Sequence, residues 1–185
     1  KQVAVIGVGT GLTTHTLLDH AGLERVDTIE IEPAMAEASR NFAPINSNAF
    51  ADPRSNIVFD DAKTYFSTNN RHYDLIISEP SNPWVSGVSS LFTSEFYRLA
   101  RRHLKPGGVM LQWFQLYEID VSLLASVLRA LGDVFPDYAI YSSTNGDLLI
   151  VAGEEAALKK PLTDITTMPG LSQELARVHI HNRRD

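Results

Sequence analysis

The sequence contains no cysteine in its 185 residues. This absence excludes disulfide bridges, thiolate zinc sites and cysteine nucleophiles, and it fits a reducing compartment. No apolar run reaches the roughly eighteen residues that a membrane-spanning helix needs. Basic residues are in the minority, with 16 Lys and Arg against 22 Asp and Glu and a formal net charge of -6. A nucleic-acid partner would favour a clustered basic face, so we expect a domain that does not bind nucleic acid. We also expect the domain to be cytoplasmic.

The start of the chain does not have the pattern of a signal peptide. One lysine precedes a short apolar run, which is soon interrupted by glycines. There is no initiator methionine, and the chain opens almost directly on an expected strand. We therefore expect a piece of a longer protein, in which a membrane segment could precede Lys1.

Short apolar runs recur along the chain and indicate buried strands. We expect strands at residues 3–6, 26–31, 57–59, 73–77, 109–114, 138–142 and 148–152. The last two flank Asn145-Gly146, a strong hairpin signal. Strands that alternate with helices and end in a hairpin predict an α/β fold. We expect a Rossmann-like, doubly wound, mainly parallel seven-stranded sheet with a C-terminal antiparallel hairpin.

Helices are expected between these strands, at residues 11–20, 33–41, 61–67, 93–104 and 121–131. Lys105-Pro106-Gly107-Gly108 is expected to stop the fourth of them. Residues 43–54 are rich in proline, asparagine and serine and are expected to form a loop. We divide the chain into one domain at residues 1–153 and a C-terminal extension at residues 154–185. The extension is expected to be partly helical or loop, with a helix at 171–178.

A glycine-rich loop, Gly7-Val8-Gly9-Thr10-Gly11, joins the first strand to the first helix. Glycines there let a ligand approach main-chain N–H groups at a helix N-terminus. A dinucleotide fingerprint needs its third glycine three residues after the second, where this chain has Leu12. The GxGxG spacing is instead typical of methyltransferase-like domains. The alternative is an ordinary tight turn.

Acidic side chains follow the second and third expected strands. Glu30 lies near the end of one strand, where a carboxylate can accept both ribose hydroxyls of an adenosine. Asp60 and Asp61 follow the next strand at the same edge of the sheet. One of them could accept a hydrogen bond from an adenine amino group, while the other interpretation is a helix N-cap.

Other polar and aromatic residues are candidates for parts of a site. Trp84 could wall a substrate pocket, or it could be a core or lid aromatic. Gln112 and Gln115 end the fifth strand, where side chains can reach the same crevice. His15 is expected on the surface of the first helix. His179 and His181 would need further ligands to hold a metal, so no metal site is expected.

Several blocks in order resemble the spermidine synthase family, the polyamine aminopropyltransferases: VAVIGVGTG, TIEIEPAM, DPRSNIVFDDAKTYF, YDLIISEPSNPW, LFTSEFY and LKPGGVMLQ. The resemblance implies a Rossmann-like core, decarboxylated S-adenosylmethionine or S-adenosylmethionine as co-substrate, polyamine biosynthesis and often a homodimer. It also implies that Gly7, Gly9, Thr10 and Gly11 line the co-substrate, that Glu30 holds the ribose, and that Asp61 with Ala62 meets the adenine.

The sequence departs from the family pattern at three positions. The acidic residue of the family's glycine loop is Thr10 here, and the two aspartates of its catalytic turn are Glu79 and Asn82, with Pro83 retained. The attacking amine must lose a proton, which a carboxylate can accept and an amide cannot. Glu79 can take this role in part, so we expect inefficient spermidine synthesis.

Two further interpretations stay open. Methyl transfer to an unknown acceptor needs mainly positioning, because the sulfonium is already activated. A catalytically silent module that binds the co-substrate or its thioether product would also retain the glycine loop while losing the catalytic turn. The acceptor itself, a small-molecule amine or another compound, is not identified by the sequence.

Overall fold

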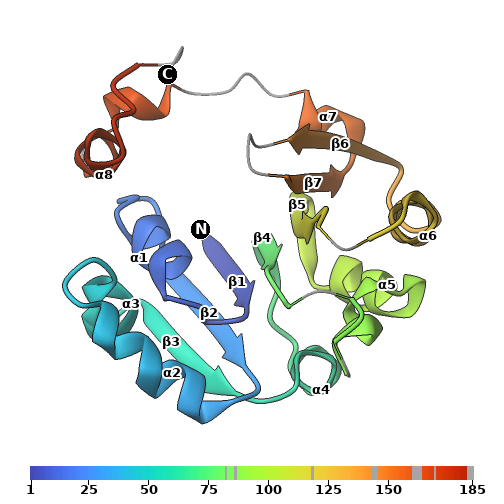
Figure 1. The fold of residues 1–185 in the computed structure, drawn as a ribbon, viewed down its shortest axis with the longest axis horizontal. Coiled ribbons are helices and arrows are strands. Elements are labelled where there is room, and N and C mark those ends of the chain that lie inside the picture. The colour runs from blue at the N-terminus through green and yellow to red at the C-terminus, as the bar shows by residue number, and fades with distance from the viewer. Residues whose placement is uncertain are drawn as a thin grey trace.

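The computed structural model describes residues 1–81, 83–85, 87–117, 119–142, 146–159, 164–168 and 170–182. Its centre is a seven-stranded sheet in the order β3-β2-β1-β4-β5-β7-β6 (Figure 1). The strands are β1 (Gln2–Ile6), β2 (Arg25–Glu30), β3 (Ser55–Phe59), β4 (Tyr73–Ser78), β5 (Leu104–Gln115), β6 (Asp137–Ser142) and β7 (Asp147–Gly153). The first five run parallel, and β7 pairs antiparallel with both β5 and β6. The predicted fold class is confirmed.

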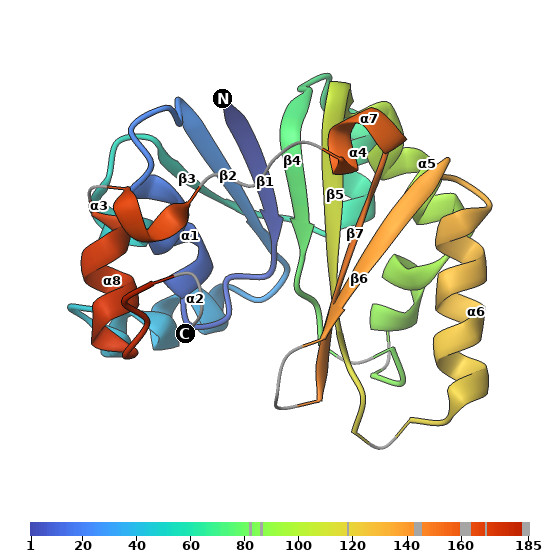
Figure 2. The same ribbon diagram turned by 90° about the horizontal axis from the view of Figure 1, so that it is seen from above.

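Helices cover both faces of the sheet (Figure 2). One layer holds α1 (Leu12–Leu18), α2 (Pro33–Ser39) and α3 (Ser47–Ala51), and the other holds α4 (Ala62–Thr68), α5 (Ser94–Arg102) and α6 (Val121–Gly132). Successive side chains of a strand point to opposite faces. Accordingly, Ala4 and Ile6 join the core beneath α4, α5 and α6, while Val3 and Val5 join a smaller core with Leu18 of α1. The central strand β1 is therefore buried on both faces.

The shorter elements complete the chain. They are the 3-10 turns η1 (Arg40–Phe42), η2 (Val88–Phe92) and η3 (Ile165–Thr167) and the helices α7 (Glu155–Leu158) and α8 (Leu171–Arg177). The helix expected at 171–178 is confirmed as α8. A cavity of about 960 Å³ lies between α1, the start of β5 and the C-terminal extension, and we call it the large cavity. Among the residues described, no helix is both long and apolar enough to cross a membrane.

The predicted boundary between α5 and β5 was wrong. Helix α5 ends at Arg102, and β5 already begins at Leu104, so Lys105-Pro106-Gly107-Gly108 lies inside an irregular strand. A Cβ at Gly108 would lie 3.0 Å from the Tyr73 carbonyl oxygen, so glycine lets the two strands approach closely here. The expected hairpin is present, with Gly146 at a φ of 80°, but Asn145 lies outside the described residues.

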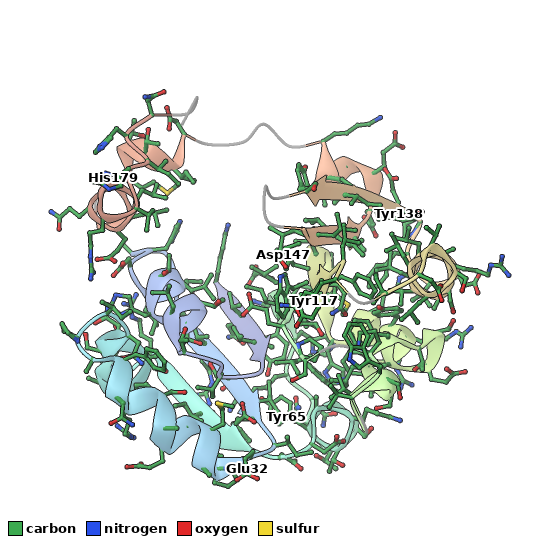
Figure 3. The ribbon with its side chains drawn as sticks, in the orientation of Figure 1. Glu32, Tyr65, Tyr117, Tyr138, Asp147 and His179 are labelled. Atoms are coloured by element: carbon green, nitrogen blue, oxygen red, sulfur yellow. The ribbon has the colours of Figure 1, made fainter. Side chains whose placement is uncertain are left out.

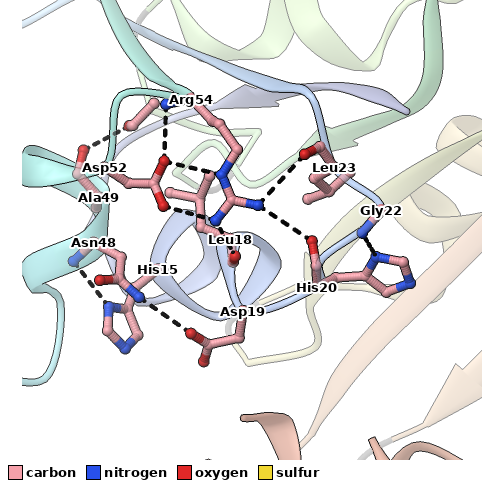
Figure 4. Close-up of polar contacts among 11 residues, drawn as sticks. His15, Leu18, Asp19, His20, Gly22, Leu23, Asn48, Ala49, Asp52 and Arg54 are labelled. Atoms are coloured by element: carbon pink, nitrogen blue, oxygen red, sulfur yellow. Dashed lines mark hydrogen bonds and ion pairs between the residues drawn. The ribbon is translucent and has the colours of Figure 1, made fainter. Parts of the chain in front are cut away.

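Residues 43–54 were expected to form a loop, but they contain α3. This helix also covers His15. His15 is buried, and its Nδ1 accepts a hydrogen bond of 3.1 Å from the backbone N–H of Asn48 in α3 (Figure 4). The expectation of a surface histidine was therefore wrong, because α3 covers this side of α1. The imidazole ties the two helices together.

Arg54 closes the end of α1 (Figure 4). Its guanidinium donates to both carboxylate oxygens of Asp52, at 3.0 and 2.7 Å, and to the carbonyl oxygen of Leu18 at 2.5 Å. The last carbonyls of a helix have no partner within the helix, so such a donor stabilises its end. Asp52 in turn has its pKa lowered, chiefly by this hydrogen bond with Arg54.

Arg54→Met is expected to lower the free energy of unfolding by about 2 kcal/mol, because the Leu18 carbonyl of α1 and the Asp52 carboxylate lose their donor. The matched control is Arg98→Met, whose exposed pair with Glu95 at 3.9 Å is expected to contribute less than about 0.5 kcal/mol. Urea unfolding followed by circular dichroism measures both variants. Equal losses in the two variants would contradict a special role for Arg54.

A second polar cluster lies within the sheet around Asp27 of β2, which is fully buried. Its Oδ1 accepts hydrogen bonds from Arg25 Nε and Asn56 Nδ2, each at 2.7 Å, and its Oδ2 accepts one from the Tyr73 hydroxyl at 3.0 Å. Tyr73 also shares a 2.7 Å hydrogen bond with the Tyr65 hydroxyl, and burial raises the pKa of Tyr73. Asp27 thus connects three strands of the sheet.

Candidate functional site

A cavity of about 420 Å³ lies at the carboxyl ends of the central strands. The strand order reverses between β1 and β4, and ligands of open α/β sheets bind at such a switch point. The arrowheads of β2 and β3 point toward α4 at this edge (Figure 1). The cavity brings together seven residues that the sequence singled out: Gly7, Gly9, Glu30, Asp60, Asp61, Ala62 and Glu79.

The glycine loop contributes two of its three glycines to this cavity. Gly7 has a φ of 95°, and a Cβ there would lie 3.0 Å from the carbonyl oxygen of Glu79. Gly9 has open space around the position of a Cβ and its φ is 51°. The loop can therefore approach β4 closely at Gly7 and a ligand closely at Gly9. The Ser39 hydroxyl holds the loop in place by donating to the Gly9 carbonyl.

Thr10 and Gly11, the other two loop residues that were predicted to line the co-substrate, face elsewhere. A Cβ at Gly11 would meet Asn46 and Phe50, so this glycine allows close packing with the α3 region. Thr10 lines the large cavity, and its carbonyl accepts a hydrogen bond of 2.7 Å from Asn46 Nδ2. Neither residue lines the smaller cavity, so their predicted contact with the co-substrate stays a prediction.

Glu30 is held rigidly at the end of β2. Its Oε2 accepts from the backbone N–H of Val8 in the glycine loop and its Oε1 from that of Glu32, both at 2.9 Å. The residue is 8% exposed and lines the cavity. Each carboxylate oxygen has further acceptor capacity. Glu30 is therefore fixed by two main-chain donors and is still able to accept hydrogen bonds from a vicinal diol.

Asp60 and Asp61 lie beside each other on the wall of the cavity. Asp61 Oδ1 accepts from the Thr64 backbone N–H at 3.0 Å, which makes Asp61 the N-cap of α4. Asp60 Oδ1 accepts from the Asp61 backbone N–H at 2.8 Å. The N-cap interpretation of Asp61 is thus confirmed. Contact between either acid and an adenine stays a prediction.

Glu79 follows β4 and is tied to the main chain of β1, because its backbone N–H donates to the Ile6 carbonyl at 3.1 Å. The Thr13 hydroxyl of α1 lies 2.9 Å from Oε2 and 3.2 Å from Oε1. Burial raises the pKa of the Glu79 carboxyl, and the hydrogen bond from Thr13 opposes this rise. A carboxylate with a raised pKa is a better proton acceptor near neutral pH.

The side chains around this cavity carry charge of one sign. Five carboxylates line it, and the described residues contribute no lysine, arginine or histidine to its wall. The five are Glu30, Glu32, Asp60, Asp61 and Glu79; Glu32 is labelled at the lower edge of Figure 3. Apolar walls come from Ile31, Met35, Val88 and Leu91. We call this site the acidic cavity, and its chemistry suits a cation with an apolar body.

Three predicted pocket residues do not line the acidic cavity. Trp84 is 43% exposed and makes an edge-on contact with Tyr117, with 6.1 Å between the ring centroids. Tyr117 is labelled in Figure 3. Gln112 is fully buried, and its amide donates to the carbonyls of Ser78 and Trp113. Gln115 lies opposite Asp147 in the β5–β7 ladder. Their predicted contact with an acceptor stays a prediction, and the predicted catalytic Asn82 lies outside the described residues.

Thr13 and Glu32 were not predicted from the sequence. Glu32 precedes Pro33 and is the N-cap of α2, where its side chain accepts a hydrogen bond from the Ala34 backbone N–H. Its local role at the helix start gave no sign that it also lines the acidic cavity. Nothing in the local sequence distinguishes Thr13 from its neighbour Thr14, whose hydroxyl instead meets Thr28. Only the packing of α1 against the end of β4 separates the two threonines. Among the described residues no acidic or histidine cluster is arranged to hold a metal ion.

The family model described as "Spermine/spermidine synthase domain" matches residues 1–145. The chain belongs to this family. The spermidine synthase-like domain is 32% identical over 136 residues to a polyamine aminopropyltransferase of Nitrosomonas europaea, covering 73% of this chain and 42% of that protein. It is 31% identical over 141 residues to the polyamine aminopropyltransferase of Caldicellulosiruptor saccharolyticus, covering 76% and 50%. The chain thus spans about half the length of these relatives, or less.

Solved structures agree with this assignment. The spermidine synthase of Thermotoga maritima superposes on the spermidine synthase-like domain with a TM-score of 0.71 at 28% identity, covering 82% of this chain and 53% of that one. A spermidine synthase in complex with the transition-state analogue AdoDATO gives 0.72 at 27% identity with the same coverage. Human methyltransferase-like protein 13, with a TM-score of 0.70 at 20% identity, shares the fold. The family uses decarboxylated S-adenosylmethionine and acts on polyamine acceptors.

Proposed function

We propose that the acidic cavity binds decarboxylated S-adenosylmethionine and that the domain transfers its aminopropyl group to an amine acceptor. The observation that carries this proposal is the set of five carboxylates, with no basic side chain among the described lining residues. The decarboxylated donor has a sulfonium and an ammonium group and no carboxylate. S-adenosylmethionine adds a carboxylate, which would face like charges without a counter-cation, and such juxtaposition costs binding free energy.

The fixed groups of the cavity suit the parts of this donor. Glu30 supplies acceptor oxygens for the ribose diol, and it is already oriented by Val8 and Glu32. Gly9 leaves room for the donor beside the main chain. Asp61 and Ala62 are the proposed contacts of the adenine, and Ile31 and Met35 supply apolar surface in the same cavity.

Glu79 is the proposed proton acceptor. The acceptor nitrogen forms a bond to the propyl carbon next to the sulfonium, and the carbon–sulfur bond breaks. The neutral thioether methylthioadenosine leaves, and the proton lost by the amine passes to the Glu79 carboxylate. The raised pKa of Glu79 favours this transfer.

The test begins with binding. Calorimetry with each donor form is expected to give at least about tenfold tighter binding of the decarboxylated form, because about 1.4 kcal/mol of like-charge repulsion corresponds to that ratio. Equal or reversed affinities would contradict the charge argument.

Product analysis then separates the possible reactions. The protein is incubated with each donor and a panel of amines that includes putrescine and spermidine, and products are identified by mass spectrometry. An added aminopropyl group supports the proposal. An added methyl group would replace it with methyl transfer, and thioether binding without product from either donor would replace it with a silent binding module.

A further inference from the structure

Thr13 makes a tertiary contact with the proposed proton acceptor. Its hydroxyl lies in the first turn of α1, and Glu79 follows β4, 66 residues further along the chain. The distances to Oε2 and Oε1 are 2.9 and 3.2 Å. A hydroxyl has a single proton to donate, so it binds one carboxylate oxygen at a time and leaves acceptor capacity on the other.

The other ionisable groups near Glu79 do not offer it a donor. Those that share its cavity are acids, at the end of β2 and at the start of α4: Glu30, Glu32, Asp60 and Asp61. On α1, His15 is buried against Asn48 of α3. The ion pairs between described residues do not include Glu79. Within the part of the chain that the structure describes, Thr13 is therefore the side-chain donor to this carboxylate.

We propose that Thr13 is a positioning residue, whose hydroxyl holds the Glu79 carboxylate in place on the wall of the acidic cavity with one oxygen left to receive a proton. The catalytic consequence of this inference rests on the proposed function. The hydrogen bond between Thr13 and Glu79, and its effect on the protonation of Glu79, do not depend on the proposed function.

The direction of the expected effect follows from the surroundings of Glu79. Burial raises the pKa of this carboxyl, and the Thr13 hydrogen bond lowers it because the hydroxyl stabilises the charged form. Without the hydroxyl the effect of burial is unopposed, so the pKa rises further. A larger share of Glu79 is then protonated at neutral pH and cannot accept the amine proton, and this loss is reversed as the pH increases.

The variants separate the hydroxyl from the shape of the side chain. Thr13→Val removes the donor and keeps the volume, Thr13→Ser keeps the donor, and Thr13→Ala serves as a second removal should valine disturb folding. Thr16→Val is the matched control, because Thr16 lies one turn further along α1 and lines the large cavity as Thr13 does, but it is not the residue that donates to Glu79. Circular dichroism checks that all four variants fold.

The first readout needs no substrate. Carbon-13 NMR follows the titration of the Glu79 carboxyl carbon, assigned by its absence from the spectrum of Glu79→Gln. The midpoint is expected to move to higher pH in Thr13→Val and Thr13→Ala and to keep its parental position in Thr13→Ser and Thr16→Val. A parental midpoint in both removal variants would overturn the inference.

The second readout is the pH profile of transfer. At pH 7 the kcat of Thr13→Val is expected to fall roughly five- to tenfold with KM within about twofold, and most of the loss is recovered at alkaline pH. A loss that is equal at every pH would show a merely structural role and would overturn the positioning role. A parental protein without any transferase activity would refute the proposed function, while the NMR titration would still decide whether Thr13 controls Glu79.

Discussion

Glu79→Gln is expected to lower kcat by about 10²- to 10⁴-fold, because an amide keeps the size of the side chain and cannot accept a proton. Binding of the donor is expected to weaken less than turnover, since four of the five carboxylates remain around the cavity. Steady-state kinetics with the decarboxylated donor and the best acceptor measure both parameters. Thr13 can still donate to the amide oxygen of the variant, so the local contact survives the change.

Glu37→Gln provides the matched control for this variant. Glu37 is exposed on α2, where it pairs with Arg40 at 3.5 Å, and it does not line the acidic cavity. Its replacement removes the same charge and is expected to leave kcat within about twofold of the parental value. A Glu79→Gln variant that keeps more than about a tenth of the parental kcat at pH 7 would mean that another group takes the proton.

Asp27→Ala is expected to lower the free energy of unfolding by about 3 kcal/mol, at the lower end for breaking a buried pair because Arg25 is partly exposed. The change removes the acceptor shared by Arg25, Asn56 and Tyr73 and leaves the Tyr73 hydroxyl buried with a single partner. For a domain whose total stability is about 5 to 15 kcal/mol, this loss is large. Urea unfolding followed by tryptophan fluorescence measures it.

Two further variants show what the network contributes. Tyr73→Phe removes the hydrogen bond to Asp27 and the one shared with Tyr65, and it is expected to cost about 2 kcal/mol. Asp133→Ala removes an exposed acid beyond the end of α6 and is expected to change stability by less than about 0.5 kcal/mol. If Asp27→Ala costs no more than Asp133→Ala, the buried network does not stabilise the sheet.

The elements that the sequence predicted well are those that depend on local backbone chemistry. The glycine loop and the acid at the end of β2 could be recognised because a tight strand-to-helix turn needs glycine, and Glu30 ends an apolar strand. The structure places Gly7, Gly9 and Glu30 on one cavity, as that pattern implied.

The features that the sequence did not predict depend on tertiary contacts. Helix α3 has five residues, too few for a periodic pattern, and Asn46 joins its start to Thr10 and Ser39. Because α3 was missed, the burial of His15 was missed too. The position of Gln112 near the end of β5 did not show which face of the sheet its side chain occupies. In the structure the Gln112 side chain points with Met110 and Phe114 into the core.

The pairing of β1 with β4 has a consequence for how this domain could diversify. The glycine loop and Glu79 emerge from neighbouring central strands, which the Glu79 N–H to Ile6 carbonyl hydrogen bond joins directly. Their spacing is thus set by the pairing of two buried central strands. If the polypeptide after Pro80 were exchanged, the distance between the glycine loop and Glu79 would be inherited unchanged, because it is set by the pairing of β1 with β4.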